Sequence, residues 1–368
     1  MWRSSFGWRF SCKAVISSQL FLNRLSKQAL NKVKNKRFEL KDWTEPNGIF
    51  IMNIPIDWQY KNVIVPDFKD ASPFSFEKYE NSIGCFQISC YPLSERGVNN
   101  NFPVQKNNSK VSWFPNRMDG KGFNVHVYYA QVDDQFCMAK YIYSTKDQDN
   151  VNVKDELEKV EVVLDTLRVI PLKDRKLASN LKKYDNFLGS LIASFDLWQK
   201  ALENDSFIEL VVITSNQIDA FLRLSIILHK QLEEETDDIE IEYLFQSDEE
   251  KGFMERKIYS DAHKLGIIDD ELKDALNDLY NNRNRVIHRY IISYIKTKDI
   301  YKIAYDYSVI AEKVRLILKS YEEKQYGKGF GIYGRDFDIN HSITEEDRKR
   351  AFAMVNDKHF LEKLKRKL

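Results

Sequence analysis

The chain has two halves with different patterns of hydrophobic and polar residues. Between about residues 40 and 170, short apolar or alternating runs are separated by prolines and asparagine-rich loops, a pattern typical of β-strands. Asp133 and Asp134 separate two such runs and predict a hairpin. Apolar residues at helical spacing predict a helix over 153–164. The predicted strands cover 49–54, 83–91, 123–132, 135–144 and 167–170. This half is therefore predicted to be an α+β sandwich.

After residue 171 the pattern changes to long helices. All eight prolines lie between Pro46 and Pro171, and proline disrupts the interior of a helix. An acidic loop over 233–250 has ten Asp and Glu residues and no basic residue, so we expect it to be solvated and mobile. Helices are predicted over 177–202, 207–232, 254–264, 270–281 and 299–319, and the helical segment that begins near Asp270 is predicted to continue through Tyr301. Together they predict a compact all-α bundle over about 175–325.

The two ends of the chain differ from both halves. Residues 1–37 contain nine Lys and Arg residues and no acidic residue. That composition fits an organelle transit peptide, a basic arm that touches RNA, or a translated upstream extension. Glycines at 329, 331 and 334 have the spacing of a phosphate-binding loop, but no predicted strand precedes them. A flexible linker is expected there, within a terminal region 326–368 whose last helix begins near Ser342 with a capping-box pattern.

Composition limits the classes of function. A chain of 368 residues predicts two domains, here 38–171 and 175–325, and a net charge of +1 provides no global field for nucleic acid. No run of about 18 apolar residues occurs, so no membrane span or membrane partner is predicted. Cys85 and Cys90 lie an odd number of residues apart and would face opposite sides of a strand. With Cys12 and Cys137 they indicate neither a zinc site nor a disulfide, which favours a cytoplasmic location.

The segment from Arg283 to Tyr290 carries the most informative chemistry. Arg283 is permanently charged and offers a planar fork to phosphate oxygens. His288 can accept and donate a proton near neutral pH. Because the ribose 2′-hydroxyl supplies the nucleophile, these groups could cleave RNA without a metal or cofactor. Asn284 would orient the substrate or donate a hydrogen bond, and Arg285 and Arg289 would add phosphate affinity.

The spacing of these residues limits how they can meet. Asn284 and His288 are four residues apart and lie on one helix face. Arg283 and His288 are five residues apart, about 140° around an ideal helix, so they do not converge by themselves. Arg283 must wrap around, or the two side chains must meet residues of a second copy across an isologous contact.

The pattern Arg283-Asn284-x-x-x-His288 resembles the signature of the HEPN superfamily. The stretch from Leu265 to Asp270 is also similar to that family. With Tyr290, the pattern resembles the subset whose tyrosine is modified by nucleotidyltransferase antitoxins. The resemblance covers about residues 176–322 and implies an all-α, often dimeric fold. Many members are metal-independent endoribonucleases used as toxins or antiphage effectors, whereas others have lost activity and serve as binding modules.

Two polar residues on the predicted 207–232 helix could support this site. Asp219 and Asn216 belong to a polar stripe. They are candidates for supporting groups that face the active-site cleft expected between two copies of the motif. A solvent-exposed stripe, or one paired within the bundle, is an equally good interpretation.

The first domain carries a different resemblance. Its run Phe50-x-x-Asn53-Ile54-Pro55-x-Asp57-Trp58 is similar to the PsbP/Mog1-like fold. That resemblance covers about 130 residues and implies a binding or sensing module, with no catalytic motif to carry across.

These observations predict a homodimeric endoribonuclease that leaves 2′,3′-cyclic phosphate and 5′-hydroxyl ends. Its partners would be RNA and an antitoxin or a sensor. One alternative is an inactive HEPN-like interaction module, in which Arg283 and His288 serve dimer packing. Another is that the pattern is not a functional motif, in which case Arg283 and Arg285 pair with acidic residues of 269–278 and His288 only packs in the bundle. A nucleotide-sensing regulatory protein is a further alternative.

Overall fold

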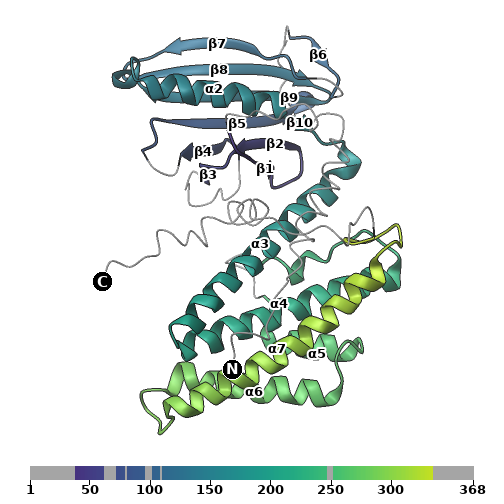
Figure 1. Ribbon diagram of the computed structural model, residues 1–368. Helices are drawn as coiled ribbons and strands as arrows, with labels where there is room; N and C mark the ends of the chain where they lie inside the picture. Colours follow the sequence, from purple (N-terminus) through teal and green to yellow (C-terminus); the bar gives the residue numbers. More distant parts are fainter. Residues whose placement is uncertain are drawn as a thin grey trace. The chain divides into compact units, whose positions relative to one another are not determined.

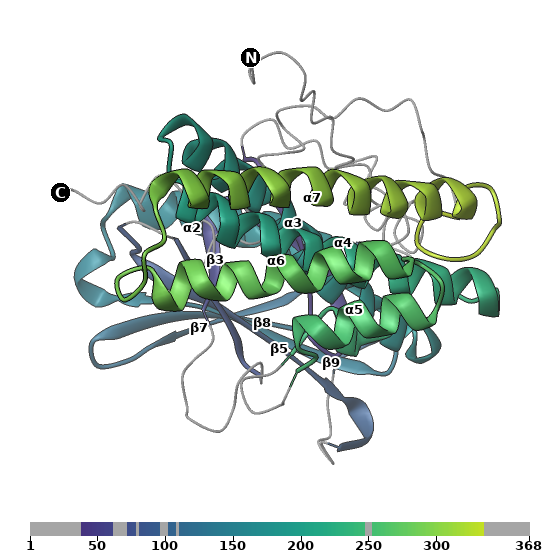
Figure 2. The same ribbon diagram turned by 90° about the horizontal axis from the view of Figure 1, so that it is seen from below.

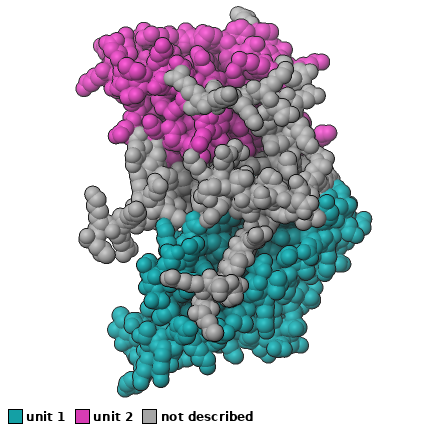
Figure 3. All heavy atoms as spheres, in the orientation of Figure 1, with its two compact units in different colours: residues 1–21, 183–355 teal, residues 22–182, 356–368 magenta. Residues whose placement is uncertain are grey.

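The computed structural model describes residues 38–61, 72–78, 81–95, 102–107, 110–246 and 252–334. The predicted basic arm and the predicted helix from Ser342 lie outside these residues. The chain divides into two compact units with a boundary between Lys182 and Lys183, inside helix α3 (Arg175–Glu203) (Figures 1 and 3). We call the described residues 38–182 the sheet unit and the described residues 183–334 the helical unit.

The sheet unit contains two mainly antiparallel sheets. A three-stranded sheet has the order β1-β2-β10, and a seven-stranded sheet has the order β3-β4-β5-β9-β8-β6, with β7 also paired to β8. The first comprises β1 Leu40–Thr44, β2 Phe50–Pro55 and β10 Arg168–Val169. The second comprises β3 Trp58–Lys61, β4 Phe74–Lys78, β5 Gly84–Pro92, β6 Val104–Gln105, β7 Phe114–Asp119, β8 Phe123–Val132 and β9 Gln135–Ser144. Short 3₁₀ helices are η1 Leu93–Glu95, η2 Thr145–Asp147 and η3 Leu172–Asp174.

The predicted hairpin joins β8 and β9. Val132 lies opposite Gln135, so Asp133 and Asp134 form the two-residue connection. Asp133 has a φ of 48°, a left-handed conformation that aspartate adopts more readily than most residues. The hairpin is confirmed, and the short strand that follows the helix does return to a sheet, as β10 on β2.

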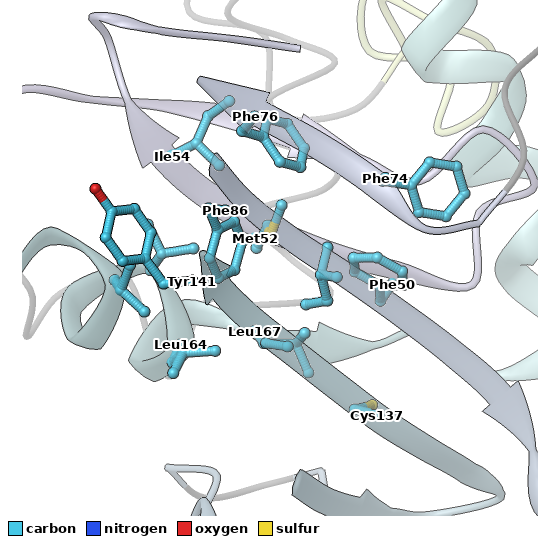
Figure 4. Close-up of a cluster of buried hydrophobic side chains, with 14 of the residues drawn as sticks. Phe50, Met52, Ile54, Phe74, Phe76, Phe86, Cys137, Tyr141, Leu164 and Leu167 are labelled. Carbon is cyan, nitrogen blue, oxygen red and sulfur yellow. The ribbon is translucent and has the colours of Figure 1, made fainter. Parts of the chain in front are cut away.

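The core of the sheet unit lies under helix α2 (Val151–Thr166), which is slightly longer than the predicted helix. The Asn150 side chain accepts a hydrogen bond from Asn152 N–H at 3.0 Å and caps its first turn. The apolar residues of α2 pack on aromatic and aliphatic side chains from both sheets, including Phe50, Met52, Phe86 and Tyr141 (Figure 4).

A second set of contacts, between polar side chains, holds α2 against residues Asp57 and Trp58 at the start of β3. Glu156 accepts a hydrogen bond from Trp58 Nε1 at 2.8 Å and one from Lys159 Nζ at 2.8 Å. Lys159 also donates to Asp57 at 2.9 Å. The Asp57-Trp58 pair of the sequence therefore holds a helix in place.

The helical unit consists of the greater part of α3 and four further long or medium helices. These are α4 Phe207–Glu234, α5 Glu255–Lys264, α6 Asp270–Arg289 and α7 Thr297–Gln325, with the short 3₁₀ helix η4 Ile241–Tyr243. Helix α4 packs against α5, α6 and α7, and α6 runs beside α7 (Figure 2). A β-rich region followed by a helical region is the predicted arrangement.

Helix α4 forms the centre of this unit. Its buried side chains include Val211, Ile218, Phe221 and Leu222. By length and composition α4 is the one described helix that could cross a membrane, and 72% of its most apolar window is buried. A core helix passes the same test, so α4 is weak evidence for a membrane span.

The predicted continuous helix from Asp270 through Tyr301 is wrong. Helix α6 ends at Arg289, and α7 begins at Thr297. The Lys296 backbone N–H donates to Asp299 Oδ2 at 2.9 Å, which caps a new helix start. Local capping therefore overrides the helical pattern at this point.

Two segments expected to be solvated or flexible pack on the helical unit. In the acidic segment, Ile239 and Tyr243 are buried, and Lys230 pairs with Glu240 at 2.5 Å. In the glycine-rich segment, Gly331 N–H donates to Asp237 Oδ1 at 2.8 Å, and the buried Tyr333 hydroxyl lies 3.0 Å from that of Tyr184. The described parts of both segments are ordered because buried tyrosines hold them against the unit. Acidic composition and glycine spacing do not reveal these buried contacts.

Candidate functional site

Helix α6 positions most of the predicted site residues. The Asp269 side chain caps its start by accepting from Leu272 N–H at 2.8 Å. Leu276, Leu279 and Val286 form its buried face. His288 and Arg289 occupy its last turn, where the helix dipole favours positive charge. The segment 283–289 therefore lies in the last two turns of a well-anchored helix.

Arg283 faces the interior of the helical unit and enters a polar cluster. Its Nη1 lies 2.5 Å from Glu255 Oε2 and 3.4 Å from Ser215 Oγ. Its guanidinium also lies over the Tyr280 ring, with 4.9 Å to the centroid. The Arg283 side chain is 18% exposed and that of Glu255 is 11% exposed. The guanidinium is thus held rigidly but keeps some access to solvent.

Asp219 joins this cluster from α4. It accepts from Arg223 Nε at 2.6 Å. Burial raises the pKa of the Asp219 carboxyl, whereas the charges of Arg223 and Arg283 oppose that rise. Asp219 thus pairs with Arg223 of the same polar stripe and also experiences the charge of Arg283. Asn216 is exposed.

Glu255 is the member of the cluster that sequence analysis missed. Burial raises the pKa of its carboxyl, and the hydrogen bond from Tyr259 and the charge of Arg283 act in the opposite direction. The Tyr259 hydroxyl donates to Glu255 Oε1 at 2.6 Å. A signal was present in the sequence: Glu255 shares a helix face with the buried Ile258, Tyr259 and Ala262. A carboxylate on such a face needs a partner.

Two polar atoms of the cluster have no hydrogen-bond partner among the described residues. They are Arg283 Nε and Asp219 Oδ1, and both are buried. Unsatisfied buried polar atoms are rare in folded proteins and often occur where a site binds water or substrate.

His288 is not part of the contacts that form this cluster. It is exposed and makes no hydrogen bond or ion pair with any described residue. Asn284 is half-buried, whereas Arg285, Arg289 and Tyr290 are exposed. Arg285 Nη1 lies 3.3 Å from Asn282 Oδ1. Within one chain, Arg283 and His288 therefore lie on different sides of α6, as the helical spacing predicts.

The alternative partners proposed for the arginines differ from the observed ones. Arg283 pairs with Glu255 and not with an acidic residue of 269–278. The hydrogen bond observed for Arg285 goes to an asparagine of its own helix.

An exposed apolar surface adjoins His288. We call it the 287–294 apolar surface; it consists of Ile287, Tyr290, Ile291, Ile292 and Tyr294. Ile291 is 92% exposed, Ile292 is 81% exposed and Tyr294 is 100% exposed. Contiguous exposed apolar residues of this kind mark contact surfaces in many proteins.

No metal site is evident in the part of the chain that the structure describes. Groups of three or more His, Cys, Asp or Glu that could hold a metal ion do not occur among these residues. His263, one of the other histidines, lies 2.9 Å from Asp270 Oδ1 in a local pair.

Comparisons with known proteins add little to these observations. No family model matches the chain, and no curated protein matches it. A solved structure from Bacteroides thetaiotaomicron VPI-5482 is similar with 13% identity and a TM-score of 0.24, over 48% of this chain and 76% of that one. The family resemblances therefore rest on the residues of the sequence.

Proposed function

We propose that the helical unit is a metal-independent endoribonuclease of the HEPN type, assembled from two copies of the chain. The observation that carries the proposal is the arrangement on α6. Arg283 is held in a buried polar cluster, and His288, five residues later on the same helix, is exposed beside an apolar surface. One helix thus presents a fixed cation and a free imidazole.

The chemistry needs only proton transfer and charge stabilisation. His288 acts as general base toward the ribose 2′-hydroxyl or as general acid toward the leaving 5′-oxygen. Arg283 binds the scissile phosphate and stabilises the charge that develops on it. The 2′-oxygen bonds to phosphorus as the bond to the 5′-oxygen breaks, so the products are a 2′,3′-cyclic phosphate and a 5′-hydroxyl. Asn284 orients the phosphate, and Arg285 and Arg289 extend the binding surface.

A second copy completes the site in this proposal. Within one chain Arg283 and His288 are separated by the width of α6, so the two groups need a partner helix to share one phosphate. The 287–294 apolar surface supplies a contact for that partner, because burying Ile291 and Ile292 removes apolar area from water. A two-fold contact there would place two α6 helices next to each other.

Glu255 and Asp219 act as positioning residues for Arg283 in this proposal. Glu255 fixes Nη1 through a 2.5 Å ion pair. Asp219 supports the cluster from α4 through its charge. The Arg283 side chain keeps 18% of its surface exposed, and a phosphate would bind to this exposed part.

A second candidate function is an inactive interaction module of HEPN type. The pairing of Arg283 Nη1 with Glu255 favours it, because that nitrogen is already occupied. The near-zero net charge of +1 also favours a module that does not bind RNA. In that case the 287–294 apolar surface would serve association alone.

The deciding experiment is RNA cleavage by the purified full chain in the presence of EDTA. Cleavage with 2′,3′-cyclic phosphate ends is expected for the natural sequence, and His288→Ala should reduce its rate by about 100-fold or more. His263→Ala is the matched control, because His263 lies in the same unit but pairs locally with Asp270. Intact RNA with the natural chain, or equal loss in both variants, would favour the inactive module.

A toxin or antiphage role, with a cytoplasmic location, extends this proposal. Tyr290 is 43% exposed in the single chain, so a modifying enzyme would reach it before two copies associate. A nucleotidyltransferase antitoxin would add a nucleotide to its hydroxyl, which mass spectrometry after co-expression would detect. The sheet unit would serve as a sensor, a substrate-positioning module or the antitoxin contact.

A further inference from the structure

Two thiols meet in the centre of the sheet unit. Strands β5 and β9 are antiparallel neighbours, and Cys90 lies directly opposite Cys137 in their register. The two Sγ atoms are 3.0 Å apart, and both residues are free cysteines. Sequence spacing between Cys85 and Cys90 gave no hint of this contact, because the partner comes from another strand.

Both thiols are shielded from water. Cys90 is 7% exposed and Cys137 is 0% exposed, and both belong to the hydrophobic core of the sheet unit. Figure 4 shows Cys137 in this core. Burial raises the pKa of the Cys90 thiol well above its ordinary value, and Cys137 and Glu45 add to the rise while Arg175 opposes it. A protonated, buried thiol is a poor metal ligand and a poor nucleophile toward large substrates.

We propose that Cys90 and Cys137 are an oxidisable pair that forms an intramolecular disulfide across β5 and β9. In the step, each thiol loses its proton and the pair loses two electrons, forming one S–S bond. The oxidant is a small disulfide, such as oxidised glutathione, which is reduced to two thiols. Hydrogen peroxide would serve equally and become two water molecules. The sulfurs need to approach by only about 1 Å to reach bonding distance.

The position of the pair determines what the bond would do. It would close a loop that contains β6, β7 and β8, the strands between Cys90 and Cys137 in the chain. A crosslink over a long loop stabilises a fold mainly by restricting its unfolded state. Because the thiols are buried, oxidation depends on transient opening of the sheet and is slow in the folded protein.

Cys85 is a built-in control. It lies on β5 opposite Ile142, on the sheet face that Cys90 does not occupy, because alternate residues of a strand face opposite sides. Any chemistry specific to the pair should spare Cys85.

The test is oxidation of the full-length chain with oxidised glutathione, followed by unfolding, alkylation of free thiols and peptide mass spectrometry. A Cys90–Cys137 linked peptide is expected in the natural sequence and in Cys85→Ser. Oxidation should raise the melting temperature of the sheet unit by about 10 °C in these two proteins. Cys137→Ser should show neither the link nor the shift.

Other products would overturn the proposal. Glutathione attached to Cys90 or Cys137 without a link, alkylation of both thiols after oxidation, or links to Cys85 or Cys12 would each do so. The linked peptide is sought in the natural sequence itself, so the outcome does not depend on whether a serine variant folds. It is also independent of RNA cleavage.

Discussion

Each unit of this protein contains a buried ion pair, and the two pairs differ in how completely their atoms are bonded. In the sheet unit, both oxygens of Glu156 accept hydrogen bonds, and Lys159 bonds to Glu156 and Asp57. In the helical unit, Glu255 and Arg283 are paired, but Arg283 Nε and the nearby Asp219 Oδ1 have no partner among the described residues.

The difference indicates what each pair is for. A fully bonded buried network rigidifies the fold, and Glu156 and Lys159 join α2 to the strand that carries Trp58. An incompletely bonded network costs free energy of folding, and functional sites are where proteins tolerate that cost. Of the two pairs, the one around Arg283 therefore keeps unused hydrogen-bonding atoms among the described residues.

The largest expected effect is on the rate of RNA cleavage, which should depend on the Arg283–Glu255 pair and not on the Glu156–Lys159 pair. Arg283→Ala should reduce RNA cleavage by about 1000-fold, because it removes the cation that stabilises the phosphate. Glu156→Ala should leave the turnover number unchanged at a temperature where the variant is folded. Rates measured under saturating RNA check both statements, and comparable losses in the two variants would remove the functional distinction.

The free energy of unfolding should depend more on the Glu156–Lys159 pair than on the Arg283–Glu255 pair, which is the reverse of the ranking for cleavage. Glu156→Ala leaves the buried Lys159 without its main partner and should lower the free energy of unfolding by about 3 kcal/mol. Glu255→Ala should cost less, about 2 kcal/mol, because Arg283 is more exposed than Lys159 and retains the nearby charge of Asp219. Urea denaturation of the two variants measures the difference. A larger loss for Glu255→Ala would mean that the helical pair is the structural anchor.

The 287–294 apolar surface offers a test of the site shared by two copies. Ile291→Asp with Ile292→Asp should weaken self-association by about 100-fold, because charges replace buried apolar area. Sedimentation at several concentrations measures it, and cleavage should fall in parallel. Leu316→Asp is the control, since Leu316 is also exposed but lies on α7. A natural chain that stays monomeric at high concentration would contradict a shared site.

The smallest effect concerns pH and a third buried carboxyl. Burial raises the pKa of Glu322 from 4.5 to about 7, although Tyr333, Arg315 and Lys319 oppose the rise. The folded state then binds more protons than the unfolded state between these values, so stability falls as pH rises from about 4.5 to about 7. The loss should be about 2 kcal/mol, below the full value of that shift, because part of the Glu322 residue remains exposed to solvent.

Thermal unfolding at several pH values checks this dependence. Glu322→Gln removes the titrating group, so the slope across that window should disappear in the variant. A slope that persists would assign the pH dependence to other groups.

Much of the secondary structure could be predicted from local patterns. Strands β8 and β9 match their predicted bounds because alternation and a two-residue turn are local signals. Helices α3, α4 and α5 match closely because their apolar faces repeat at helical spacing. The end of α6 at Arg289 was not predicted, because the helical pattern of the sequence continues past this residue. The capping contact of Asp299 starts a new helix at Thr297 instead.

The sequence by itself determined the order of a β-rich region and a helical region, and it placed Arg283, Asn284 and His288 on one helix. Only the tertiary structure paired Arg283 with Glu255, set Cys90 against Cys137 and packed Tyr333 beside Tyr184. Periodicity reports which residues share a face of one element. Contacts between distant elements depend on packing and register, which no local pattern encodes.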